Sequence, residues 1–244
     1  MRAYAALPLL ALACLASACG SSKTSPEACA SSAVEALNVC ASGTTTKGVD
    51  VSTYQGAVTW SKVKAAGIEF AFARISDGTA NPDDQFTANW KGMKSAGVVR
   101  GAYQFWRASV DPTAQADLVA SSLKAAGGFE AGDLPIVMDI ETADGASAAT
   151  ISAHMKTWLD AVKASTGKTP LIYTSEGTYP LTSTTYDTYD LWVANYTTGC
   201  PIMPVGWTKW VFWQNADNGA VNGISGGVDT DEFNGSLAQL TTYA

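Results

Sequence analysis

The sequence predicts an α/β fold, a single irregular β/α barrel of about eight strands. From Gly48 onward, short apolar runs rich in β-branched residues alternate with longer amphipathic stretches. This alternation is typical of parallel strands joined by helical crossovers. Eight such runs in 244 residues fit one closed barrel. No glycine-rich phosphate loop follows the first run, which weakens the alternative of an open nucleotide-binding sheet.

Each expected strand is a short apolar run bounded by Gly, Pro or polar residues. In chain order the strands are Gly48–Ser52, Ile68–Arg74, Val98–Phe105, Leu134–Glu141, Pro170–Thr174, Leu191–Tyr196, Trp210–Gln214 and Gly227–Asp231. The expected helices are Trp60–Ala66, Asp84–Ala96, Pro112–Ala126 and Ala146–Thr166, each followed by a glycine. After the fifth strand the connections lack helical periodicity, so helices should be few or short in the last third.

Residues 1–18 predict a signal peptide. A positive start precedes an apolar stretch that is too short to span a bilayer comfortably, and Ala16-Ser17-Ala18 suits a signal peptidase. The residues before Cys19 also resemble a bacterial lipobox, in which Cys19 would carry a lipid; plain secretion after Ala18 is the alternative. We therefore expect export, either to the extracellular space or to the membrane of a bacterium as a lipoprotein.

The remaining chain divides into residues 19–46, a tether rich in Ser, Thr and Ala, and residues 47–244, the barrel domain. In an oxidising compartment Cys29 and Cys40 form the natural local disulfide. Cys200 would then be free, or paired with Cys19 if that residue carries no lipid. The single histidine, His154, lies mid-helix, which argues against a Ser-His-Asp triad and a histidine-rich zinc site.

Composition narrows the choice of partners. Hydrophobic residues make up 47 % and charged residues 15 %, which is typical of a globular domain with a sizeable core. The formal net charge of −7 disfavours nucleic acid as a partner, and it disfavours polybasic attachment to a membrane. We expect no cofactor, and a monomer as the default state.

Polar residues collect at the carboxyl ends of the expected strands, where β/α barrels carry their active sites. The fourth strand is apolar until it reaches Asp139 and Glu141. Strand side chains alternate, so these two carboxyls point to the same side, about 6.5–7 Å apart at Cβ. Like charges this close raise one pKa, which leaves an acid beside a carboxylate, as glycoside hydrolysis requires.

Two other interpretations of the acids exist. A hard cation could bind Asp50, Asp139, Glu141 and Asp229 through their oxygens. The cluster could also be merely structural, although unpaired acids at strand ends are costly without a role. We favour the catalytic interpretation and expect no metal.

Aromatic residues are expected at the same rim, where flat rings suit the apolar faces of sugars. They are Tyr103, Phe105, Trp106, Tyr173, Trp192, Tyr196 and Trp213. For substrate binding we favour Tyr103, Phe105, Tyr173, Trp192 and Trp213, with Asn195 and Gln214 supplying amides. The alternative, ordinary core packing, is expected for Trp60, Trp90 and Trp158.

Six segments carry a resemblance to a known family: Gly48–Ser52 with Gln55, Gly56 and Trp60; Arg100–Phe105; Met138–Glu141; Leu191–Tyr196; Trp213–Gln214; and Gly223–Asp229. Their order and spacing resemble the glycoside hydrolase family 25 lysozymes, the Chalaropsis type. The resemblance covers about Lys47 to Leu240. One departure is Asp231, which stands where many members have Asn.

The resemblance implies an irregular β/α barrel that cleaves the β-1,4 bond between N-acetylmuramic acid and N-acetylglucosamine in bacterial peptidoglycan. By resemblance, Glu141 is the general acid, Asp139 orients or stabilises the substrate, and Asp50 and Asp229 are further cleft acids. It leaves open whether the mechanism is covalent or substrate-assisted. The alternatives are a hydrolase of another N-acetylated glycan such as chitin, and a non-catalytic wall-binding lipoprotein.

Overall fold

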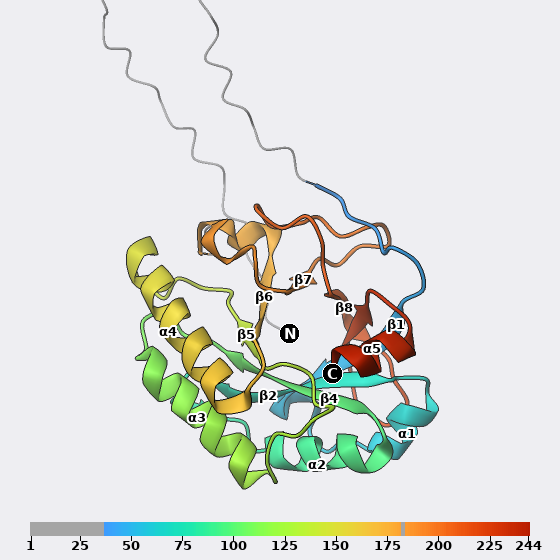
Figure 1. Cartoon of the computed structure of the whole chain (residues 1–244). Helices are drawn as coiled ribbons and strands as arrows, with labels where there is room; N and C mark the ends of the chain where they lie inside the picture. The colour runs from blue at the N-terminus through green and yellow to red at the C-terminus, as the bar shows by residue number, and fades with distance from the viewer. Residues whose placement is uncertain (1–36, 182–183) are drawn as a thin grey trace, which may run out of the picture. The chain divides into compact units, whose positions relative to one another are not determined.

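The computed structural model describes residues 37–181 and 184–244. The expected signal peptide, Cys19 and Cys29 lie outside these residues. The described chain forms a closed eight-stranded barrel with few helices, which confirms the predicted fold (Figure 1). Around the barrel the strands are β1 (Thr46–Val51), β9 (Val228–Phe233), β8 (Phe212–Gly219), β7 (Leu191–Ala194), β6 (Leu171–Ser175), β5 (Val137–Asp139), β4 (Val99–Phe105) and β2 (Phe70–Asp77). Pairing of β1 with β2 closes the ring, and β3 (Asn81–Pro82) adds a short antiparallel edge to β2.

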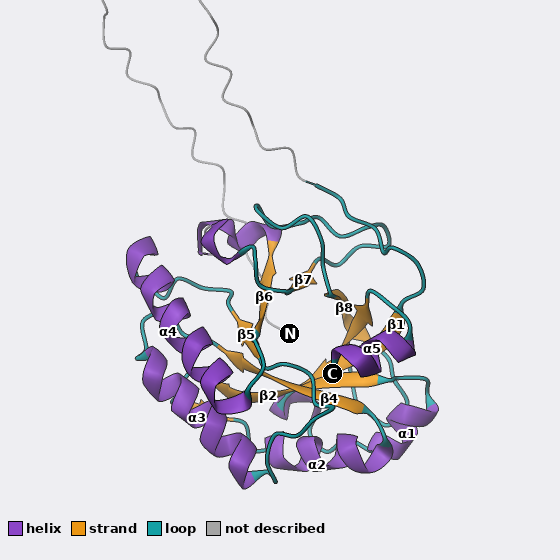
Figure 2. Cartoon of the chain, viewed as in Figure 1, coloured by secondary structure: helices purple, strands orange, loops and turns teal. Residues whose placement is uncertain are grey.

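Helices cover the first two thirds of the barrel and are short or absent beyond (Figure 2). The expected helices are present as α1 (Trp60–Ala65), α2 (Phe86–Ala96), α3 (Pro112–Ala125) and α4 (Ala148–Thr166). After β6 come two 3-10 turns, η2 (Glu176–Leu181) of six residues and η3 (Thr184–Tyr186) of three. The chain ends with α5 (Leu237–Tyr243), which the sequence did not predict. Among the described residues, no helix combines the length and apolar character needed to cross a membrane.

Two strands differ from the prediction. The last strand, β9, runs antiparallel to both β1 and β8, because β8 and β9 are joined directly by a turn instead of a helical crossover. The fourth expected strand is shorter than Leu134–Glu141: β5 ends at Asp139, so Glu141 lies two residues beyond it in the loop toward α4. Glu141 is therefore positioned by that loop and not by strand pairing.

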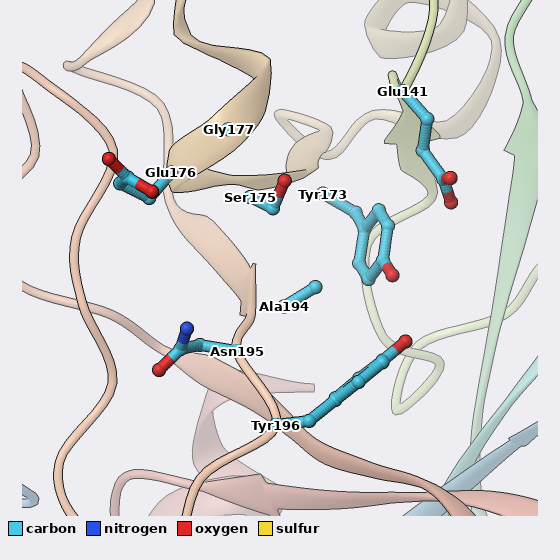
Figure 3. A pocket seen from close by; sticks show the side chains of 8 residues that line it. All are labelled: Glu141, Tyr173, Ser175, Glu176, Gly177, Ala194, Asn195 and Tyr196. Carbon is cyan, nitrogen blue, oxygen red and sulfur yellow. The ribbon is translucent and has the colours of Figure 1, made fainter. Parts of the chain in front are cut away.

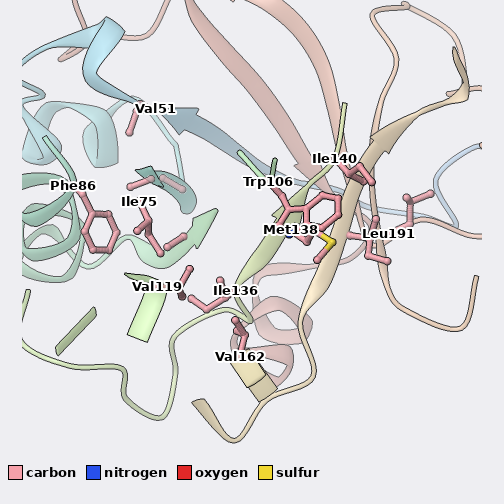
Figure 4. Close-up of a cluster of buried hydrophobic side chains, with 14 of the residues drawn as sticks. Val51, Ile75, Phe86, Trp106, Val119, Ile136, Met138, Ile140, Val162 and Leu191 are labelled. Carbon is pink, nitrogen blue, oxygen red and sulfur yellow. The ribbon is translucent and has the colours of Figure 1, made fainter. Parts of the chain in front are cut away.

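Side-chain alternation divides the apolar residues into two layers. Inward-facing rings fill the barrel interior, and Phe72 stacks on Trp192 at 4.6 Å between ring centroids. A Cβ at Gly48 would lie 2.2 Å from the Phe70 ring, so this crowded interior requires glycine there. The outer layer, between strands and helices, contains Trp60, Trp90 and Trp158, as predicted, and part of it appears in Figure 4.

The segment before β1 is fastened to the barrel by a disulfide between Cys40 and Cys200, 160 residues apart in sequence. The predicted Cys29–Cys40 pairing is therefore wrong. Asn38 pairs antiparallel with Ile202, which brings Cys40 to a Cα–Cα distance of 4.6 Å from Cys200. The Trp210 indole donates to the Val39 carbonyl at 2.7 Å. Packed structure thus begins before residue 47, the boundary drawn from composition.

Because this bond closes a long loop, its removal should lower the free energy of unfolding by about 2–5 kcal/mol. Cys40→Ser, Cys200→Ser and the double variant are expected to show the same loss in urea unfolding monitored by circular dichroism. Cys29→Ser is the control and should unfold like the unaltered protein. A loss in Cys29→Ser, with Cys200→Ser unaffected, would contradict the observed pairing.

Candidate active site

Two adjoining pockets open at the carboxyl end of the barrel. The central pocket is lined by the ends of β1, β2, β4, β5 and β9, and it includes Asp50, Asp139, Glu141 and Asp229. The side pocket lies toward β6 and β7 and includes Ser175, Glu176 and Asn195. Three residues line both pockets: Glu141, Tyr173 and Tyr196. Together the two pockets form one cleft with Glu141 where they meet.

Strand geometry places the acids. Asp50 on β1 is the register partner of Asp229 on β9, so their side chains are cross-strand neighbours on the inner face. Asp139, at the end of β5, is 4 % exposed, and its Oδ1 has no hydrogen-bond partner in the described chain. Glu141 is exposed to solvent but enclosed by the cleft walls. The predicted pair thus comprises one buried and one accessible carboxyl.

Burial and mutual repulsion raise the pKa values of these acids. Burial raises the pKa of Asp139 well above its usual range, and the charge of Glu141 raises it further. Burial also raises the pKa of Glu141, while a hydrogen bond donated by Asp139 acts in the opposite direction. These directions favour a single proton shared within the Asp139–Glu141 pair over ionisation of both carboxyls.

Burial and neighbouring carboxylates also raise the pKa values of Asp50 and Asp229. Burial and the nearby Asp229 raise the pKa of Asp50, although a hydrogen bond from Gln214 lowers it in part. Burial raises the pKa of Asp229 to about 6, with smaller contributions from Asp217 and Glu141. The cleft accordingly holds protons at mildly acidic pH that free carboxyls would have released.

Gln214 organises the floor of the central pocket. Its Nε2 donates to Asp50 Oδ2 at 2.7 Å, and its Oε1 accepts from the hydroxyls of Tyr173, at 2.7 Å, and Tyr196, at 2.9 Å. These three bonds use the amide at both ends and so fix its orientation. Gln214 therefore links β8 to β1, β6 and the loop after β7, and it sets the direction in which both tyrosines point.

Figure 3 shows the side pocket from close by. The hydroxyls of Tyr173 and Tyr196 and the carboxylate of Glu141 lie on one side of it, whereas Glu176 and Asn195 lie on the other. Asn195, expected to bind substrate, has its Oδ1 engaged by the Ile202 backbone N–H at 3.2 Å. Its amide Nδ2 therefore remains the group with which it could contact a ligand.

Only some of the aromatic residues predicted at the rim line the cleft. Tyr103, Phe105, Tyr173 and Trp192 line the central pocket. Trp192 is 1 % exposed and donates its indole N–H to Asp231 Oδ1 at 2.9 Å, so it forms a floor and offers no free face.

Trp213 does not reach the cleft, and neither does Trp106; both belong to the outer layer beneath the helices and loops. Trp213 donates to the Asn195 carbonyl at 2.8 Å and packs edge-on against Trp210. The physical reason is alternation: its neighbour Gln214 points inward, so Trp213 must point outward.

Two exposed tyrosines at the cleft were not among the predicted binding residues. Tyr54, in the 3-10 turn η1 (Thr53–Gln55) after β1, is 83 % exposed, and Tyr196 after β7 is 54 % exposed. The guanidinium of Arg74 lies 5.2 Å from the Tyr54 ring centroid and is held by Asp83 at 3.0 Å. Position in the first loop at the carboxyl end, four residues after Asp50, was the signal that could have identified Tyr54.

The geometry does not support a cation site at the acids. In the chain that the structure describes, no group of three or more His, Cys, Asp or Glu side chains is arranged so that it could hold a metal ion. What the cleft offers chemically is a pair of carboxyls with raised pKa values, further acids beside them, and exposed rings at its rim.

Comparison with known proteins gives a consistent result. The family model for Glycosyl hydrolases family 25 matches residues 49–224. Lysozyme M1 of Streptomyces globisporus is 38 % identical over 211 residues, 81 % of this chain and 71 % of that protein. An N,O-diacetylmuramidase of Chalaropsis sp is 30 % identical over 207 residues, 76 % of this chain and 96 % of that protein. The crystal structure of a bacterial lysozyme from Streptomyces coelicolor superposes with a TM-score of 0.75 at 36 % identity, covering 82 % of this chain and 96 % of that one.

The raised pKa of Asp229 predicts a pH-dependent stability cost. The pKa is about 6 in the folded protein against an ordinary value of 3.8, so folding favours the protonated form, and stability is lost as pH rises through that window. Asp229→Asn removes the charge and should raise the free energy of unfolding at about pH 7.5 by roughly 1–3 kcal/mol.

Below about pH 3.5 the Asp229→Asn gain should vanish, because both states are then protonated. Urea unfolding at the two pH values measures the difference. The control is Asp117→Asn on the exposed face of α3, which should show no such pH-dependent gain. An equal effect of Asp229→Asn at both pH values would contradict the assignment of the cost to ionisation.

Proposed function

The chain belongs to glycosyl hydrolase family 25 and is a glycosidase; from this premise we propose that it is a lysozyme that cleaves peptidoglycan between N-acetylmuramic acid and N-acetylglucosamine. The family match, the lysozymes and muramidases among the relatives, and the barrel they share support this activity. One observation of the cleft carries it further: the buried Asp139 and the accessible Glu141 both line the central pocket, Glu141 stands where the two pockets meet, and burial raises both pKa values.

Accessibility assigns the two roles within the pair. Glu141 lines both pockets and is exposed, so it can reach a glycosidic oxygen lying between two sugars, and it acts as the general acid. Asp139 is buried behind it and shares its proton, which keeps Glu141 supplied. When it is protonated, Asp139 can also donate to the substrate, and an N-acetyl carbonyl is the acceptor that such a sugar offers.

Asp50 and Asp229 stabilise the positive charge that forms on the substrate during cleavage. As the bond to the leaving oxygen breaks, positive charge develops on the sugar ring. Carboxylates fixed beside that ring stabilise the charge without having to reorganise. Asp50 is held by Gln214 and lies opposite Asp229, so these two residues supply the negative field in this proposal.

The exposed rings at the rim suit a glycan chain that runs along the cleft. Tyr54 and Tyr196 are exposed, with Arg74 near one face of the Tyr54 ring, whereas the rings of Tyr173 and Trp192 are largely covered. Apolar faces of sugars stack on such exposed rings, and sugar hydroxyls bond to the carboxyls and amides between them. We therefore propose Tyr54 and Tyr196, in place of Trp192 and Trp213, as the residues on which sugars stack.

The substrate also bears on location. Peptidoglycan lies outside the cytoplasmic membrane, so an enzyme that cuts it must reach the far side of that membrane. The signal-like sequence of residues 1–18 supports export, and the lipobox-like residues before Cys19 support a lipid anchor there. In this proposal the protein acts as a monomer, extracellular or attached to the membrane of a bacterium.

Digestion of purified peptidoglycan by the chain without residues 1–18 tests the activity. Mass spectrometry should detect fragments with N-acetylmuramic acid at the new reducing end. N-Acetylglucosamine at that end would mean that the other glycosidic bond is cut. Intact peptidoglycan with hydrolysis of chitin oligomers would establish a different N-acetylated glycan as substrate, and binding without any cleavage would leave a wall-binding role.

Removal of the proposed general acid should lower the catalytic rate without lowering the stability of the fold. Glu141→Gln keeps the side-chain shape but cannot donate a proton, and we expect kcat to fall by roughly 10²- to 10⁴-fold with the thermal midpoint unchanged or raised. The unaltered enzyme should lose activity at alkaline pH as the shared proton is released. Glu130→Gln, an exposed glutamate paired with Lys94 away from the cleft, is the matched control and should keep full activity. Full turnover in Glu141→Gln would refute the role of Glu141.

A further inference from the structure

One guanidinium joins three loops at the carboxyl end of the barrel. Arg107, in the loop between β4 and α3, donates from Nε and Nη2 to both carboxylate oxygens of Asp77, at 2.5 and 2.7 Å. Its Nη1 donates to Asp144 Oδ1 at 3.2 Å. Asp77 ends β2, and Asp144 lies three residues after Glu141 in the loop from β5 to α4. Arg107 therefore connects the loop that carries Glu141 to two other walls of the cleft.

The backbone of Arg107 is itself fixed from below. The buried side chain of Gln115 on α3 accepts from the Arg107 N–H and donates to the Arg107 carbonyl, both at 2.9 Å. On the neighbouring β2–β3 turn, a Cβ at Gly78 would lie 2.9 Å from Arg107 Cγ, so the turn can pass over this side chain only with glycine there. These contacts leave Arg107 little freedom to move.

Asp144 has an unusual backbone conformation. With φ of 47°, it is the one residue other than glycine in the described chain with a positive φ. A conformation of this kind persists only where surrounding contacts enforce it. Here the carboxylate supplies them: Oδ1 accepts from Arg107, and Oδ2 accepts from the Ala108 N–H at 2.9 Å. Thr142 adds two local bonds, from its hydroxyl to Asp144 Oδ1 at 3.4 Å and from the Asp144 N–H to that hydroxyl at 3.2 Å. The contacts with Arg107 and Ala108 are the ones that tie this loop to the neighbouring wall of the cleft.

Arg107 also contacts the cleft wall and acts on its charges. Its guanidinium carbon lies 4.5 Å from the ring centroid of Phe105, which lines the central pocket. The ionisable groups that line the central pocket with Glu141 are Asp50, Asp139, Asp229, Tyr54, Tyr103, Tyr173, Tyr196 and Arg74. Arg107 is the cation whose charge lowers the pKa of Glu141. The same side chain therefore influences both the position and the proton affinity of the acid.

We propose that Arg107 is a positioning residue for Glu141, and that the Asp77–Arg107–Asp144 cluster holds the general acid against the glycosidic oxygen. This inference rests on the proposed function. It assigns a role to a residue that has no contact with substrate: Arg107 acts through Asp144 and the loop. The loop of Glu141 has no strand pairing beyond Asp139, and the cluster substitutes for that pairing.

Two substitutions separate geometry from charge. Arg107→Lys keeps the charge but loses the bidentate contact, so kcat should fall on the order of tenfold to a hundredfold, with the alkaline limb of its pH profile unmoved. Arg107→Met loses both, so kcat should fall at least as far and the alkaline limb should move to higher pH. The sign follows because loss of a cation raises the pKa of Glu141 and keeps the acid protonated longer.

Arg100→Lys is the matched control. Arg100 makes a similar bidentate pair with Asp133, at 2.6 and 3.0 Å, but near the start of β4, six residues or about 20 Å of extended strand from the loop that carries Arg107. This variant should lose stability without any shift in the pH profile. If the Arg107 variants do not fold, Asp144→Asn tests the contact from its other side. Asparagine tolerates the same backbone conformation, so the variant should fold, and its kcat should be several-fold lower.

The titration of Glu141 gives a readout that needs no turnover. Its carboxyl carbon, followed by NMR and assigned by its absence in Glu141→Gln, should titrate at higher pH in Arg107→Met than in the unaltered protein. Folded Arg107 variants with unchanged kcat and titration would overturn the inference, as would losses that only track unfolding. Inactivity of the unaltered protein on peptidoglycan would instead refute the proposed function, and the titration shift would still test the electrostatic action of Arg107.

Discussion

The burial of several carboxyls at one end of a closed barrel is the constraint on which the rest of the structure depends. Asp50, Asp139 and Asp231 are almost fully buried, and Glu141 and Asp229 stand in the cleft beside them. Such a group is stable only with donors, protons or cations nearby. Gln214 and Trp192 supply donors from below, and Arg74 and Arg107 supply charge at the rim. The remaining repulsion appears as raised pKa values, and these make acid catalysis near neutral pH feasible.

Closure of the barrel by an antiparallel strand makes this crowding unavoidable. Because β9 runs back along β1, Asp229 lies directly opposite Asp50, and Asp231 lies one step deeper beside Trp192. Asp231 Oδ2 has no partner in the described chain, and burial raises the pKa of this carboxyl. A protonated aspartate there would have the shape and polarity of the asparagine that the resemblance led us to expect at this position. The departure from the family pattern is thus consistent with the same interior architecture.

In the proposed catalytic pair, a strand positions one carboxyl and a loop positions the other. Asp139 owes its position to pairing of β5 with β4 and β6, which is a rigid arrangement. Glu141 stands beyond that pairing, where it can reach the substrate but needs other support. The cluster around Arg107 supplies support from loops that belong to three different strands. An acid on a braced loop can be accessible and well placed at once, which a residue in mid-strand cannot.

Sequence by itself determined the fold class, the order of strands and helices, and the acids of the cleft, because periodicity and strand-end position are local properties. Alternation could also have excluded Trp213 once Gln214 was placed inside. Tertiary structure alone decided the partner of Cys40, the direction of β9 and the contact of Arg107 with Asp144 in the loop that carries Glu141. Each of these depends on residues far apart in the chain. Cys40 and Cys200 are neighbours only because the segment before β1 pairs with the loop after β7, a contact that no local pattern encodes.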